Sequence, residues 1–234
     1  MAGDLHPIFL VEEAVKAIGL VDAHGHSLIP AHVLHSWVVM IVLVFLAVLA
    51  TRKLSLVPRG LQNFFETLIE SLENFVVANM GEDGRKVFPV LATLFIYILF
   101  SNYEGLVPGA DAPTANINTT LSMAVFIFVY YQYWGFKLHG WRYVHHFTGP
   151  VPWLAPLIFP IEVIGHFARM LSLSLRLFGN IRGEDIVLAL LFMLAPIVST
   201  VPIYFLFMLL KVIQALVFFM LSMLYLKGAF EEAH

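Results

Sequence analysis

The most informative stretch of the sequence covers residues 172–180, where an arginine interrupts a long apolar segment. The stretch reads Ser-Leu-Ser-Leu-Arg-Leu-Phe-Gly-Asn, with Arg176 at its centre. An arginine stays protonated at physiological pH, and a charge at the centre of a bilayer costs roughly 2.5–3.5 kcal/mol on insertion scales. Because Arg176 cannot give up its proton, it cannot relay protons. We expect it to act as a fixed charge, which makes it a candidate gate.

Arg176 belongs to a polar stripe along one predicted helix. At about 100° per residue, six side chains fall within an arc of roughly 80°: Glu162, His166, Arg169, Arg176, Asn180 and Glu184. The rise from the first to the last is roughly 33 Å, which matches the hydrocarbon thickness of a bilayer. A row of small residues beside the stripe would let another helix approach closely: Gly165, Ser172, Gly179 and Gly183. The stripe is therefore predicted to line a complete crossing.

The returning helix carries a weaker polar face, with Lys211 and Gln214 at mid-depth. Between residues 157 and 226, four basic side chains stand against three acidic ones, Glu162, Glu184 and Asp185, which leaves one surplus positive charge. Any single polar group here can serve a buried structural network, but an unpaired buried charge is expensive, so a carboxylate from another subunit is implied. The candidate relay groups on the two sides of Arg176 are Glu162, His166, Asn180, Glu184, Asp185 and Gln214.

The composition predicts an integral membrane protein. Of 234 residues, 60% are hydrophobic and 12% charged, whereas soluble domains carry roughly 25% charged residues. The absence of cysteine excludes disulfides and thiolate metal sites, and a net charge of -3 gives no reason to expect nucleic acid. Histidines at 24, 26, 32 and 35 are predicted to be solvated rather than metal-binding, so no metal or cofactor is expected.

Apolar periodicity predicts an all-α membrane protein with five membrane helices and one interfacial amphipathic helix. The membrane helices are expected at residues 33–50, 87–107, 117–136, 160–195 and 201–226, and the last two form a long tilted hairpin. The acidic polar face of the amphipathic helix, residues 58–80, favours docking on protein over binding to anionic lipid. The predicted regions are a leader (1–32), three spans with the surface helix (33–140), a connection (141–156), the hairpin (157–228) and a tail (229–234).

Basic residues in the loops predict the orientation. Arg52, Lys53, Arg59, Arg85 and Lys86 follow the first span, whereas residues 105–116 hold no Lys or Arg. By the positive-inside rule, the amino terminus is expected outside and the carboxyl terminus in the cytoplasm.

The stretch around Arg176 resembles the a subunit of F-type ATP synthases. Glu162 stands fourteen positions before the arginine, Gln214 lies on the returning helix, and further similar motifs occur at residues 57–63, 116–124 and 225–232. The resemblance covers about residues 33–232. It implies a non-catalytic stator subunit that carries two offset half-channels against a ring of c subunits, with the b-subunit stalk and lipid as further partners.

The resemblance also implies residue roles. Arg176 would face the ring carboxylate, Asn180, Asp185 and Gln214 would line the outer half-channel, and Glu162 and Ser172 the inner one. Two points do not fit the family pattern simply. The family pattern selects Asp185 as the outer relay carboxylate, whereas regular helical geometry places Glu184 on the polar stripe. In addition, Phe207 stands where the family pattern has a relay His or Glu. We hypothesise that Lys211, one turn further on, takes over part of that role, paired with Glu184 or Asp185.

Two other classes of protein fit the sequence less well. A secondary ion-coupled transporter also places charges at mid-membrane, but the two halves of this sequence show no internal repeat. A membrane metalloenzyme would need clustered histidines, and those near the amino terminus are predicted to lie on the opposite side from His145 and His146.

Overall fold

The computed structural model describes residues 29–52, 55, 57–107, 110–140, 155–194 and 200–230. All regular structure in these ranges is helical, which confirms the all-α class. The elements are α2 (Ala31–Thr51), α3 (Leu61–Met80), η1 (Gly81–Asp83), α4 (Gly84–Glu104), η2 (Pro113–Ala115), α5 (Ile117–His139), α7 (Ala155–Leu194) and α8 (Thr200–Phe230). Residues 1–28, 141–154 and 231–234, which include most of the leader, the connection and the tail, lie outside the described residues.

Three described stretches are long and apolar enough to cross a membrane, namely Ala31–Thr51, Leu61–Glu104 and Val201–Phe230. The other two expected spans are present as helices, α5 with 23 residues and α7 with 40. Neither α5 nor α7 is both long and apolar enough to count among these stretches. Helix α7 carries six ionised side chains. The number of five membrane helices therefore stays a prediction.

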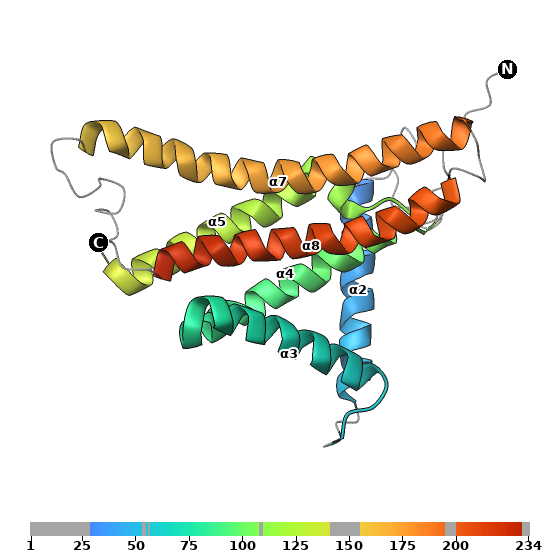
Figure 1. Cartoon of the computed structure of the whole chain (residues 1–234), viewed down its shortest axis with the longest axis horizontal. Helices are drawn as coiled ribbons and strands as arrows, with labels where there is room; N and C mark the ends of the chain where they lie inside the picture. Colours follow the sequence, from blue (N-terminus) through green and yellow to red (C-terminus); the bar gives the residue numbers. More distant parts are fainter. Residues whose placement is uncertain are drawn as a thin grey trace.

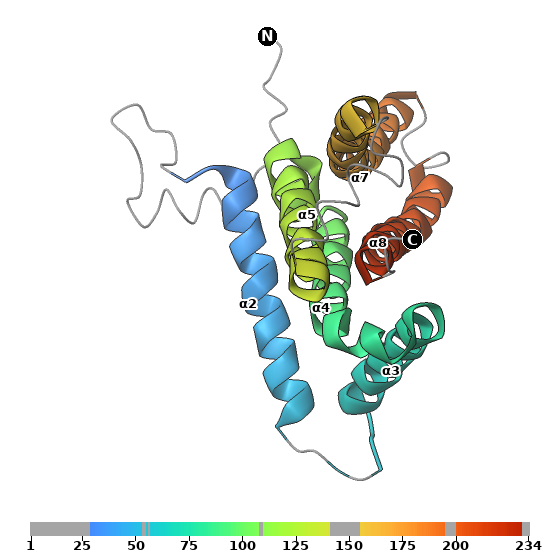
Figure 2. The same ribbon diagram turned by 90° about the vertical axis from the view of Figure 1, so that its left-hand side faces the viewer.

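The length of α7 determines how it can sit in a bilayer. Forty residues extend about 60 Å at 1.5 Å per residue, roughly twice the hydrocarbon thickness. Figure 1 shows α7 and α8 antiparallel and side by side, both at a steep angle to α2. In Figure 2 they are seen nearly end-on, with α4 and α5 between them and the upright α2. A strongly tilted hairpin follows from this geometry if α2 crosses the membrane upright.

The core lies where α4, α5, α7 and α8 meet. Its buried side chains include Phe95 of α4, Ile127 of α5, Leu177 of α7 and Phe218 of α8. Each of these helices contributes one apolar face, and because lipid tails are as apolar as these side chains, van der Waals packing between the faces holds the helices together in a membrane. Helix α2 contributes no residue to this buried cluster and lies at the edge of the bundle (Figure 2).

The amphipathic helix α3 folds back on α4 through a tight turn. Gly81 adopts φ +70°, a conformation that glycine tolerates best, and a Cβ on Gly84 would lie 2.8 Å from Cγ1 of Val76. Arg85 then reaches Glu73 of α3 at 3.4 Å. The helix therefore packs on neighbouring protein.

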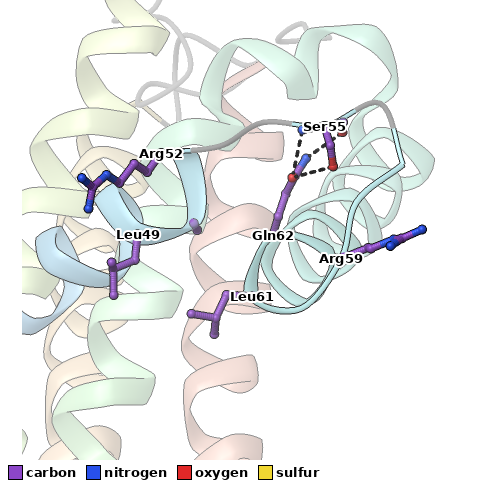
Figure 3. A pocket seen from close by; sticks show the side chains of 7 residues that line it. Leu49, Arg52, Ser55, Arg59, Leu61 and Gln62 are labelled. Atoms are coloured by element: carbon purple, nitrogen blue, oxygen red, sulfur yellow. Dashed lines mark hydrogen bonds between the residues drawn. The ribbon is translucent and has the colours of Figure 1, made fainter.

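A pocket of about 320 Å³ lies between the end of α2 and the start of α3. Figure 3 shows Gln62 hydrogen-bonded to Ser55 at its rim, while Arg52 and Arg59 point in opposite directions. Because the two cations do not converge, the pocket does not form a site for an anionic group.

Candidate functional site

The polar stripe of α7 runs along the boundary between a packed and an open face. Arg169, Arg176 and Asn180 are exposed, whereas His166 and Glu184 are only 4% and 8% exposed. In a regular helix His166 and Glu184 lie at the edge of the arc that turns towards the buried residues of α7, about 80° from Arg176. One edge of the stripe therefore faces the inside of the bundle, and the rest of the stripe faces outward.

Arg176 stands on the open side. Within the described ranges, its guanidinium takes part in no hydrogen bond or ion pair. The neighbouring small residues are open too, because a Cβ on Gly165, Gly179 or Gly183 would meet nothing within 4 Å, and Ser172 is exposed. A charge, small residues and exposed leucines thus share a face that the described part of the chain does not cover.

Lys211 of α8 provides the hairpin's buried ion pair. Its Nζ atom lies 3.2 Å from Oε2 of Glu184, and the two side chains are 2% and 9% exposed. Asp185 also interacts electrostatically with Lys211, but among the described residues it forms no ion pair within 4.0 Å. The helix is continuous through this stretch, so of the two carboxylates Glu184 takes the position on the stripe.

A second contact between α7 and α8 lies one turn away. Nδ2 of Asn180 donates to Oε1 of Gln214 at 2.5 Å. Asn180 precedes Glu184 by four residues and Gln214 follows Lys211 by three, so the two pairs occupy successive turns of both helices. Four predicted site residues are therefore brought together in one cluster, which we call the Lys211 cluster.

Two further predicted residues, Glu162 and His166, form a separate cluster towards the amino end of α7, here called the His166 cluster, whereas Ser172 and Asp185 belong to neither cluster. Oε1 of Glu162 lies 3.4 Å from Nε2 of His166 and 3.8 Å from Nη2 of Arg169. The hydroxyl of Tyr131 on α5 hydrogen-bonds to Nδ1 of His166. Arg176 stands between the clusters, about 21 Å along the helix from Glu162 and about 12 Å from Glu184.

Several polar residues that contact the hairpin were not predicted from the sequence. Asn102 of α4 donates to the backbone oxygen of Lys211 at 3.3 Å and accepts from Thr114 of η2 at 2.7 Å. Thr120 of α5 pairs with Ser174 of α7 at 3.0 Å. A buried Ser-Asn dipeptide at 101–102 in an otherwise apolar helix was the available signal, because buried polar groups need partners.

The prediction that the histidines near the amino terminus are solvated is wrong for His35, which is fully buried because it packs against Glu104 of α4. Among the described residues, no group of three or more His, Cys, Asp or Glu side chains is arranged to hold a metal ion. Of the six histidines considered, only His32 and His35 fall within the described ranges.

Comparisons with known proteins identify the family of this chain. A family profile described as ATP synthase A chain matches residues 33–227. Two relatives named ATP synthase subunit a are similar over 100% of both chains, that of Solidesulfovibrio magneticus at 56% identity and that of Nitratidesulfovibrio vulgaris at 54%. Another of that name, from Trichlorobacter lovleyi, is 44% identical over 98% of this chain and 100% of its own. The chain is thus an integral membrane protein that belongs to the ATP synthase A chain family.

Proposed function

We propose that this chain is the proton-translocating, non-catalytic stator subunit of a rotary F-type ATP synthase, with Arg176 as a fixed-charge gate between two offset half-channels. The observation that carries the proposal is the position of Arg176: exposed on an uncovered face, unpaired within the described ranges, and flanked by polar clusters on both sides. Membership of the family supports the same function.

The gate follows from charge. Arg176 stays protonated, so protons cannot pass along α7 from one cluster to the other by way of its side chain. A carboxylate that moves past it on a neighbouring subunit would be favoured in its ionised form and would release its proton there. The surplus positive charge of the hairpin gives that carboxylate its electrostatic partner.

The two clusters would supply the two half-channels. The Lys211 cluster, together with Asp185, would line the outer half-channel, and Glu162, His166 and Ser172 the inner one. Because Lys211 holds Glu184 in a buried ion pair, Asp185 stays the carboxylate available to relay protons. We assign to the Lys211–Glu184 pair part of the role of a relay group at position 207, where this chain has Phe207.

The partners follow from the uncovered face of α7. Its row of small residues suits close approach by helices of a c-subunit ring, since small side chains let helix backbones come together in membranes. The b-subunit stalk, the rest of the ATP synthase and membrane lipid complete the surroundings. We place the amino terminus outside and the carboxyl terminus inside a bacterial inner membrane, from the loop charges.

The decisive experiment is ATP-driven acidification of inverted vesicles that carry Arg176→Ala. We expect acidification to be lost, because a neutral side chain neither blocks the path nor drives deprotonation. Arg182→Ala is the matched control, since Arg182 is also exposed but lies about 120° away around α7, off the polar stripe. Normal acidification by an assembled Arg176→Ala complex would contradict the proposal.

A further inference from the structure

A second buried pair of titratable side chains joins α2 to α4, away from the hairpin. Nδ1 of His35 lies 2.8 Å from Oε1 of Glu104, and the two side chains are 0% and 12% exposed. His35 stands 69 positions before Glu104, so the pair exists only through tertiary packing. The simplest role for such a pair is to tether the peripheral helix α2 to the bundle.

The pair keeps unused hydrogen-bonding capacity, which a tether does not need. Nε2 of His35 and Oε2 of Glu104 are both buried and have no hydrogen-bond partner among the described residues. Oγ of Ser101, one helical turn before Glu104, is in the same state. Buried polar atoms in native proteins nearly always bond to protein or to water, so these three atoms are suited to a short chain of water molecules.

Polar side chains continue from this pair to the hairpin. Asn102 follows Ser101, is fully buried, and donates to the backbone oxygen of Lys211. Thr114, which bonds to Asn102, lies in η2, and η2 packs against α2, α4, α5 and α7. Buried polar groups therefore extend from α2, past the end of α4, to the Lys211–Glu184 pair of the proposed outer half-channel.

We propose that the juxtaposed His35 and Glu104 form a proton-binding relay site at the outer access of that half-channel. The site takes up one proton from the outer side, shares it between Nδ1 and Oε1, and gives up one proton to the water chain beside the Ser101 hydroxyl, so its net charge returns to the starting value. Imidazole and carboxylate suit this role because both exchange protons readily. The inference rests on the proposed function, which sets the outer side and the direction of flow.

Passive proton conduction tests this site. Membranes stripped of the ATPase head are given a potassium diffusion potential with valinomycin, and the rate of proton uptake is measured. We expect His35→Gln and Glu104→Gln each to lower the rate about tenfold or more, because neither amide relays protons as the original groups do. Glu104→Asp keeps a carboxylate and should restore part of the rate. His32→Gln, on the same helix outside the pair, is the matched control and should conduct as wild type.

The variants separate a relay from a tether. Glutamine at position 104 is nearly isosteric with glutamate and still accepts a hydrogen bond from His35, so a purely structural contact survives Glu104→Gln, and wild-type conduction by that variant would overturn the relay. If His35→Gln fails to assemble, the rate of proton uptake in Glu104→Gln membranes still distinguishes a relay from a tether. If Arg176→Ala abolishes pumping while both glutamine variants conduct normally, the relay alone is wrong; normal pumping by Arg176→Ala would instead remove the proposed function.

Discussion

Arg176 and Lys211 are two cations of one hairpin in opposite surroundings. Lys211 is 2% exposed and paired with Glu184, whereas Arg176 is exposed and has no ion pair among the described residues. Removing one partner of a buried ion pair leaves an uncompensated charge and costs about 3–5 kcal/mol. A cation on an open face has no such internal role, which leaves its charge free to act on another subunit.

Lys211→Ala tests the first of these roles. It should destabilise the subunit by about 3–5 kcal/mol and lower proton pumping in vesicles, because Glu184 is left buried and unpaired. Thermal unfolding in detergent checks the stability and ATP-driven acidification checks the pumping. The double variant Lys211→Met, Glu184→Leu removes both charges and should recover stability without recovering pumping. Wild-type pumping by Lys211→Ala would refute a role for this pair in the proton path.

At the level of elements, α7 has one face for its own chain and one for another. Leu173, Leu177 and Ile181 are buried against the bundle, while the small residues and Arg176 lie on the outside. Apolar packing holds the inner face, so the outer face can remain uncovered without loss of the fold. Such an arrangement suits a helix that slides against a moving partner.

Gly179→Leu tests that outer face. A Cβ at position 179 meets nothing within 4 Å, so the change should leave the subunit's own fold intact, and leucine is the better helix former. We expect pumping to fall sharply because the larger side chain keeps the partner helices away. Gly228→Leu is the matched control, since that glycine is equally open but lies at the far end of α8. Equal pumping by the two variants would show that close approach at Gly179 is not required.

Across the whole molecule, many large apolar side chains are left exposed by the packing of the described helices. Large apolar side chains are exposed along α2, where lipid can cover them, and also around Arg176 on α7, where a lipid-facing cation is costly. These two surfaces therefore call for different surroundings. Protein is the better neighbour for α7.

Extraction in mild detergent checks this prediction. The subunit should purify together with a ring of small helical hairpin subunits and a soluble ATPase head, identified by mass spectrometry. Vesicles reconstituted from that complex should acidify on addition of ATP. Recovery of the chain as a monodisperse protein without other subunits, under conditions that keep the ATPase complex intact, would argue against the stator assignment.

The sequence by itself determined the helices and the composition of the polar stripe. Hydropathy and periodicity are local properties, so residues 160–195 revealed both a long helix and the arc shared by Arg176 and Glu184. Resemblance to the F-type a subunit then predicted the family, which the comparisons confirm. The surplus charge pointed to an external partner, which the open face of α7 now supports.

The tertiary structure decided which polar groups meet. Because α7 packs on α8, Lys211 forms its ion pair with Glu184 rather than with Asp185. Because α2 packs on α4, His35 pairs with Glu104. Periodicity cannot supply such contacts, because a helix repeat fixes the face on which a residue lies but not the helix that this face will meet. That choice depends on how apolar surfaces from distant segments bury one another, and it appears only in the assembled bundle.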